Sequence, residues 1–132
     1  MSVIALMAFG AVLQTAPAAE AILQRLDLTS FRNSTGPAGS PGLKYPRDWT
    51  FTDLSVEDDV ARLDRKGDWA ISLRVLRPVS DGVVVCFMDR ALNGGSYNAR
   101  QALLVAPDGE GGFRVVDEDL SEPGCEPLPG QG

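Results

Sequence analysis

Residues 69–88 read WAISLRVLRPVSDGVVVCFM, and this stretch decides the fold. Apolar side chains occupy every second position of its first part: Trp69, Ile71, Leu73 and Val75. This period of two predicts a strand with one face in the core. A turn at residues 78–82 leads into the run from Val83 to Met88, which is apolar at every position and predicts a strand covered on both faces. Because the connection is short, the two strands should be antiparallel neighbours.

Four more strands are predicted on either side of this pair. Strand patterns run over residues 49–54, 60–64, 97–105 and 113–116. Turn residues separate them, among them Asn93-Gly94-Gly95, a tight-turn sequence that tolerates positive φ. Six strands joined by short loops predict a mainly β member of the α+β class, with an antiparallel meander that forms a curled sheet or a small closed barrel.

One short amphipathic helix is predicted before the sheet. In residues 19–28, Ile22, Leu23 and Leu26 share one side at helical spacing, so the helix should dock on the concave face. Residues 29–48 show no periodic apolar pattern, and a connection of that length is typically functional or mobile. The element order over residues 19–119 resembles the cystatin-like and nuclear transport factor 2-like α+β arrangements, a similarity of fold that implies no function.

The longest apolar stretch is residues 3–13. As a helix it would rise about 16 Å, too little for a hydrocarbon core of about 30 Å, so no membrane span is predicted. Ala16-Pro17-Ala18 supplies small residues at the positions that a signal peptidase reads. We therefore expect residues 1–18 to be a signal peptide and residues 19–132 to be a single β-rich domain of an exported, periplasmic or secreted protein. The alternative is an N-terminal helix packed on the sheet, since no Lys or Arg precedes Arg25.

The chain has two cysteines, Cys86 and Cys125. An exported chain meets an oxidising compartment, which favours a disulfide between them. In the chain-entropy model such a bridge stabilises the fold by about 4 kcal/mol. The alternative is a buried free thiol at Cys86, whose neighbours in the sequence are apolar.

The net charge of −6 is concentrated near the C-terminus. Residues 108–132 hold seven acids and one base, whereas the other 107 residues balance eleven acids against eleven bases. The end of the chain is also rich in Pro and Gly, which predicts an irregular acidic tail. No basic face is available to displace counterions from phosphates, so nucleic acid is not expected as a partner. An unknown protein or small ligand is expected instead, and a basic protein is permitted.

The composition also limits the chemistry. The chain contains no histidine, which excludes Ser-His-Asp and Cys-His catalysis and removes the commonest zinc ligand. Phosphate-cradling and dinucleotide motifs are lacking too, so no cofactor is expected and a non-enzymatic role is favoured. Acid clusters at residues 57–59 and 117–119 do not have the spacing of a calcium loop, and no metal is expected there. Solvated charges that protect a sheet edge are the favoured interpretation.

The densest polar cluster surrounds the turn at Asn93. Hairpin geometry should bring these side chains to one end of the sheet: Arg90, Asn93, Tyr97, Asn98 and Arg100. The two arginines could form a fork for a carboxylate or phosphate, which makes the cluster a candidate ligand-binding site. Turn chemistry with cross-strand ion pairing is the alternative. Three aromatic residues, Trp49, Phe51 and Trp69, are predicted to pack in the core rather than to line a cleft.

Three functions remain open. The first is a small exported, non-enzymatic binding or interaction domain. The second is an inhibitor of a basic enzyme such as a lysozyme, because the loop at residues 93–97 is similar in composition to the Ser/Gly-rich loop of small barrel-type lysozyme inhibitors. The third is a histidine-free hydrolase or lyase that uses Asp, Tyr and Arg, and a cluster of strongly perturbed acids in a cleft beside Arg90 or Arg100 would favour it.

Overall fold

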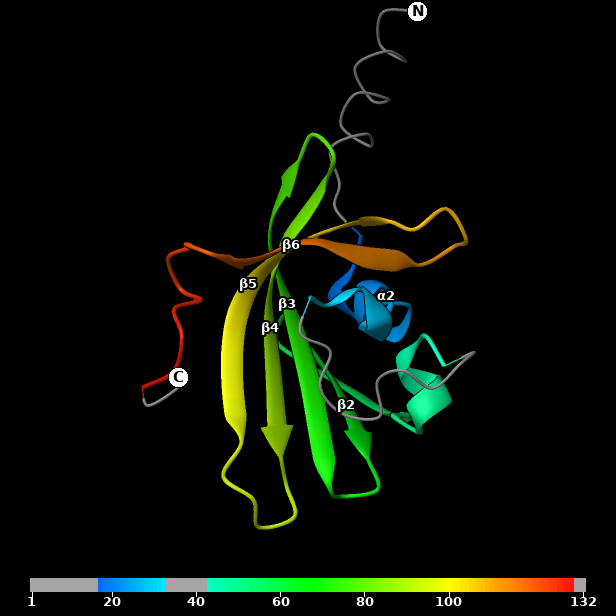
Figure 1. The fold of residues 1–132 in the computed structure, drawn as a ribbon, viewed down its shortest axis with the longest axis vertical. Helices are drawn as coiled ribbons and strands as arrows, with labels where there is room; N and C mark the ends of the chain where they lie inside the picture. Colours follow the sequence, from blue (N-terminus) through cyan, green and yellow to red (C-terminus); the bar gives the residue numbers. More distant parts are fainter. Residues whose placement is uncertain (1–16, 33–42, 130–132) are drawn as a thin grey trace, which may run out of the picture.

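The computed structural model describes residues 17–32 and 43–129, which form one six-stranded antiparallel sheet and one short helix (Figure 1). The strands pair in chain order: β1 (Asp53–Glu57), β2 (Val60–Arg65), β3 (Trp69–Val79), β4 (Gly82–Ala91), β5 (Asn98–Pro107) and β6 (Phe113–Leu120). The predicted meander is confirmed. The sheet is open, so β1 and β6 are its edges and the barrel alternative is not adopted.

The principal core lies between the sheet and the helix α2 (Ala19–Gln24). Its residues include Ile22, Leu23 and Leu26, none of which is exposed, and the alternating side chains of β3. Opposite residues in an antiparallel pair share a face, and the pairing of Leu73 with Phe87 places the core side of β3 beside the core side of β4. The burial of Ile22, Leu23 and Leu26 confirms the predicted apolar side of the helix. The predicted signal peptide falls almost wholly on residues 1–16, which lie outside the described part of the chain.

The helix is shorter than the predicted range of residues 19–28. It ends at Gln24, because the following residues pair with β6 instead of continuing the helical hydrogen bonds. Phe113 donates its N–H to the carbonyl of Arg25 at 2.8 Å and accepts from the N–H of Asp27 at 2.7 Å. This forms a parallel bridge between Leu26 and Phe113, and a short 3₁₀ helix, η1 (Leu28–Ser30), follows it.

The prediction of a strand over residues 49–54 is wrong in its position. Residues Pro46–Trp49 form the 3₁₀ helix η2, and β1 begins only at Asp53. The Asp48 carboxylate accepts the backbone N–H groups of Lys44 and Tyr45, and Thr50 then turns the chain with a left-handed φ of 64°. Trp49 and Phe51 are both buried in the core, as the packing interpretation predicted, although they do not belong to a strand.

A second, smaller core covers the other face of the sheet. Cys86 and Cys125 form the predicted disulfide, with their Cα atoms 5.7 Å apart, and they pack with Ala102. The bridge holds the C-terminal segment, residues 121–129, against the outer side of β4 and β5. The segment is irregular but Cys125 is only 1% exposed. This cover explains why the run from Val83 to Phe87 is buried on both faces.

Three arginines hold the same C-terminal segment on the sheet. Arg74 donates to the carbonyl of Gly124 at 3.2 Å, and Arg77 donates to the carboxylate of Glu122 at 2.7 Å. From β5, the Nε of Arg100 donates to the carbonyl of Glu126 at 2.7 Å. Among the residues described, no helix has the length and apolar character needed to cross a membrane.

Candidate functional site

The hairpin between β4 and β5 stands at one end of the sheet, beside the turn between β2 and β3 (Figure 1). Its last ladder bond runs from the Ala91 N–H to the Tyr97 carbonyl at 3.0 Å, so the loop between them is longer than a tight turn. The Leu92 N–H donates to the Asp68 carbonyl at 2.9 Å, which ties the loop to the neighbouring turn. Residues 93–97 are all exposed, and a Cβ added at Gly94 would meet no atom within 4 Å. The loop therefore protrudes into solvent.

The predicted site residues meet at this end but divide between the two faces of the sheet. Arg90 is opposite Asn98 in the register, and Met88 is opposite Arg100, which places the two arginines on the outer face. Tyr97 lies on the core face, in line with Ala91. Asn93 lies in the exposed loop, where its side-chain oxygen accepts from the Gly95 N–H at 3.4 Å.

The two arginines differ in their surroundings. Arg90 is exposed, whereas Arg100 is partly buried and is engaged by the C-terminal segment through Glu126. An arginine held in this way contributes to the fixation of that segment. Of the two, Arg90 is the one whose position at the surface suits contact with a partner.

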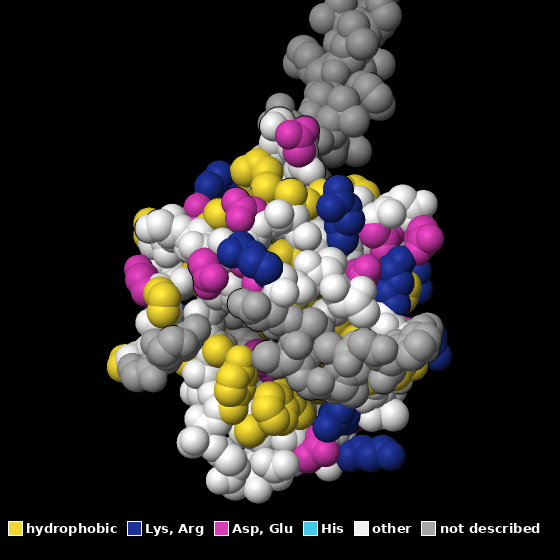
Figure 2. Space-filling model, viewed as in Figure 1, with side chains coloured by type: hydrophobic (Ala, Val, Ile, Leu, Met, Phe, Trp, Pro, Cys, Tyr) yellow, Lys and Arg dark blue, Asp and Glu magenta, His cyan; other side chains and the backbone are white. Residues whose placement is uncertain are grey.

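An aromatic pair occupies the core-face side of the hairpin. The rings of Trp69 and Tyr97 lie 5.6 Å apart between centroids with an interplanar angle of 31°. Trp69 is paired with Ala91, and Ala91 is followed in the same row by Tyr97, so the small methyl group between them leaves room for the rings to meet. Tyr97 is 44% exposed, while Trp69 also packs on the core. Hydrophobic side chains gather over the lower ends of β3 and β4 on this face of the molecule (Figure 2).

A half-buried carboxylate fixes the tryptophan. The indole N–H of Trp69 donates to the carboxylate of Asp89, which stands diagonally across from it on β4. Burial raises the pKa of Asp89 above its usual value, and the hydrogen bond from Trp69 acts in the opposite direction. The prediction that Trp69 packs in the core did not include its contact with Tyr97. Trp69, Ala91 and Tyr97 form one row across β3, β4 and the residue before β5, and this register cannot be read from any local feature of the sequence.

A second polar cluster, which sequence analysis missed, joins residues 43–48 to the turn between β5 and β6. The Tyr45 hydroxyl donates to Asp108 at 2.6 Å, and the Lys44 ammonium lies 3.8 Å from the same carboxylate and contacts Glu110. Asp108 also accepts the N–H of Gly112 at 2.9 Å. The guanidinium of Arg25 covers the ring of Tyr45 at 4.3 Å. We call this cluster the Lys44 buckle.

The groups of the Lys44 buckle satisfy one another, so the cluster fixes structure. The Tyr45 hydroxyl and backbone N–H groups lower the pKa of Asp108 to about 2, and the contact with Glu110 raises the pKa of Lys44. Gly112 is packed so tightly that a Cβ there would lie 2.6 Å from the carbonyl oxygen of Arg25. The interpretation of residues 29–48 as a functional or mobile connection extends beyond this cluster, and residues 33–42 lie outside the described part of the chain.

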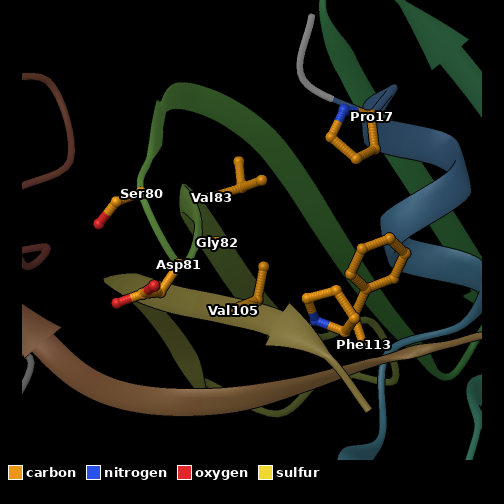
Figure 3. Close-up of a pocket in the computed structure, with 8 residues that line it drawn as sticks. Pro17, Ser80, Asp81, Gly82, Val83, Val105 and Phe113 are labelled. Atoms are coloured by element: carbon orange, nitrogen blue, oxygen red, sulfur yellow. The ribbon is translucent and has the colours of Figure 1, made fainter. Parts of the chain in front are cut away.

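A hollow of about 360 Å³ lies at the opposite end of the sheet (Figure 3). Val83, Val105 and Phe113 provide apolar walls, and Pro17 stands beside them, while Ser80 and Asp81 border the hollow from the turn between β3 and β4 with their oxygens pointing away from these walls. None of the predicted site residues lines it. The hollow therefore does not join the hairpin site.

In residues 17–32 and 43–129, no three Cys, Asp or Glu side chains come close enough together to hold a metal ion. Comparison of the chain with protein-family models, with curated protein sequences and with solved structures finds no match. The geometry and chemistry of the site are therefore the guide to its function.

Proposed function

We propose that this protein is an exported, non-enzymatic binding domain that recognises a partner through the β4–β5 hairpin. The observation that carries the proposal is the exposed ring of Tyr97, supported from beneath by Trp69, which the Asp89 carboxylate holds in turn. Tyr, Trp and Arg dominate the energetics of protein interfaces, and a side chain that is already fixed loses little entropy on binding. Export is supported by the Cys86–Cys125 disulfide and by the apolar stretch of residues 3–13.

The same geometry favours binding over hydrolysis. A catalytic role for the cluster requires a perturbed acid beside Arg90 or Arg100. Asp89 has a raised pKa, but it is on the core face, whereas both arginines are on the outer face. Glu126, the acid beside Arg100, has its pKa lowered by backbone N–H groups, among them that of Gly124, so it is held as a carboxylate and is not suited to donate a proton. Its carboxylate faces an indole N–H and has no arginine opposite it.

The test compares Tyr97→Ala and Arg90→Ala with Arg114→Ala, an exposed arginine on β6 that serves as the matched control. Each variant is used as bait, with cross-linking, against the secreted or periplasmic fraction of the source cells. We expect the first two variants to lose the partner that the wild type and the control capture, with melting temperatures that remain within a few degrees. Capture of the same partner by all variants would remove the hairpin from the proposed interface.

Arg100→Ala separates a binding role from a structural one. Because its Nε holds the carbonyl of Glu126, we expect this substitution to lower the free energy of unfolding by about 1–2 kcal/mol, whereas Arg90→Ala changes it by less than about 0.5 kcal/mol. Urea denaturation measures both. An equal loss of stability in the two variants would mean that Arg90 is structural as well.

The protruding loop also supports a second candidate, an inhibitor of a basic enzyme such as a lysozyme. Residues 93–96 project from the sheet end without contacts at Gly94, which suits insertion into a substrate cleft. Turnover of bacterial cell wall by lysozyme, measured with and without the purified chain, tests this candidate. Inhibition that disappears when residues 93–96 are shortened to a two-residue turn would favour it over the general binding role.

A further inference from the structure

The strand β1 lies at the edge of the sheet and pairs on one side only. It is hydrogen-bonded to β2, and no other described segment pairs with its outer edge. All five of its residues are exposed. The N–H and C=O groups along such an edge are available to a further strand.

One face of β1 is apolar and uncovered. Leu54 is opposite Leu63 and Val56 is opposite Ala61, so both side chains lie on the core side of the sheet. Leu63 and Ala61 are buried, yet Leu54 is 41% exposed and Val56 is 50% exposed. The difference arises because α2 packs mainly against β2 and β3 and does not extend over the edge.

The other face of β1 is acidic. Asp53 and Glu57 are on this face, and the turn that follows adds Asp58 and Asp59. Residues 53–59 contain no Lys or Arg, and none of these four acids forms an ion pair with another described residue. The nearest arginine on β2, Arg62, is paired with Asp64 at 2.6 Å and does not neutralise them.

These charges decide which strand can pair with the edge. If a second copy of the chain paired antiparallel about Ser55, Asp53 would stand opposite Glu57 of the second copy at both ends of the strand. Like charges directly opposite each other destabilise a strand pair. A strand with Lys or Arg at these positions would instead place positive charges opposite Asp53 and Glu57, which is favourable. Its apolar side chains would extend the row formed by Leu54 and Val56.

We propose that β1 binds an extended segment of a partner protein in which basic and apolar residues alternate, and that this segment adds a seventh strand to the sheet. Strand addition takes its affinity from main-chain hydrogen bonds and its specificity from alternate side chains. Asp53 and Glu57 would select basic residues about 13 Å apart along the segment. This surface is separate from the β4–β5 hairpin, so the proposal does not depend on the function proposed for the hairpin.

The probe is a capped, fluorescent peptide of about seven alternating Lys and Val residues, titrated into the full chain at low salt and followed by fluorescence anisotropy. Two control peptides have the same length. One has Lys and Val in separate blocks, and the other alternates Glu and Val. We expect only the alternating cationic peptide to bind, with backbone N–H groups of β1 becoming protected from hydrogen exchange.

The matched variants neutralise two acids each. Asp53→Asn/Glu57→Gln should weaken binding of the alternating peptide about fivefold, because two exposed ion pairs are removed. Asp81→Asn/Asp119→Asn makes the same change in net charge away from β1 and should leave the affinity unchanged. The proposal is overturned if no peptide binds at millimolar concentration, if the block peptide binds equally well, or if the two double variants weaken binding equally. Protection confined to residues outside β1 would overturn it too.

Discussion

Each edge strand of the sheet has backbone N–H and C=O groups that no further strand of the sheet pairs, and the two edges differ in how these groups are protected. At β6 the chain covers the first part of its own edge: Phe113 bonds to the backbone on both sides of Leu26, and the Val115 N–H donates to the hydroxyl of Ser30 at 2.8 Å. At β1 no described segment plays this part, and acids surround the bare strand instead. A covered edge is closed to every partner, whereas a charged edge is closed only to partners of like charge.

The largest expected effect comes from breaking the cover of β6. Gly112→Ala places a methyl group against the carbonyl of Arg25 and the ring of Tyr45, so the segment after α2 has to move away. We expect the free energy of unfolding to fall by about 2 kcal/mol, measured by urea denaturation.

The control for that substitution is Gly95→Ala, where the nearest atoms are side-chain atoms 3.4 Å away in the exposed loop. Its stability should stay within about 0.5 kcal/mol of the wild type. Equal losses in the two variants would show that the close approach at Gly112 does not matter for the covered edge.

Acid should loosen the covered edge next. The pKa of Asp108 is lowered from 3.8 to about 2, so the stability that this carboxylate contributes is fully present above about pH 4 and is lost as the pH falls toward 2. Asp108→Asn should flatten the dependence of the free energy of unfolding on pH in this range. A variant with the same acid slope as the wild type would contradict the role given to the Lys44 buckle.

Asp89 should show the opposite pH dependence. Because its pKa is raised in the folded protein, its contribution to stability is present at low pH and is lost as the pH rises through the folded pKa. Asp89→Asn should therefore change the pH dependence in the direction opposite to that of Asp108→Asn.

The smallest effect on stability, and the sharpest test of the bare edge, is expected from Asp53→Asn/Glu57→Gln. Exposed charges without ion-pair partners contribute little, so the free energy of unfolding should change by less than about 0.5 kcal/mol. Removal of the like charges should nevertheless allow β1 strands of two molecules to pair. Sedimentation velocity at increasing concentration should then show stronger self-association than the wild type. A variant that remains monomeric at all concentrations would mean that the acids are not what prevents β1 strands of two molecules from pairing.

The elements that the sequence predicted correctly depend on local pattern. Alternation in Trp69–Val75 and the unbroken apolar run after Val83 identified the central strands, and the presence of only two cysteines left one possible pairing. The error at residues 49–54 has a clear cause, because Trp49 and Phe51 are two positions apart and both buried, as in a strand. A 3₁₀ helix followed by a left-handed residue produces the same spacing.

The parts that could not be predicted depend on contacts between distant segments. Tyr45 meets Asp108 across 63 residues, and no local feature of either residue indicates the other. For the candidate site, hairpin geometry correctly placed Arg90 and Asn98 together, and counting along each strand would have shown that Tyr97 faces the other way. The face on which each residue lies could thus be predicted from the sequence. The contact between Tyr97 and Trp69 could not, because it depends on the register in which the strands pair.

The hydrogen bonds between β6 and residues 25–30, the segment after α2, affect the order in which the chain folds. A meander gains each hairpin by a short closure, so its strands can assemble one after another. Ser30 and Val115 are 85 residues apart, and their loop is costly to close unless the hairpins between them have already shortened it. During synthesis from the N-terminus, α2 can contact β2 and β3 early, whereas residues 25–30 must wait for nearly the whole chain before they can bond to β6. We therefore expect the bonding of residues 25–30 to β6 to be the last step of folding and the first to be undone.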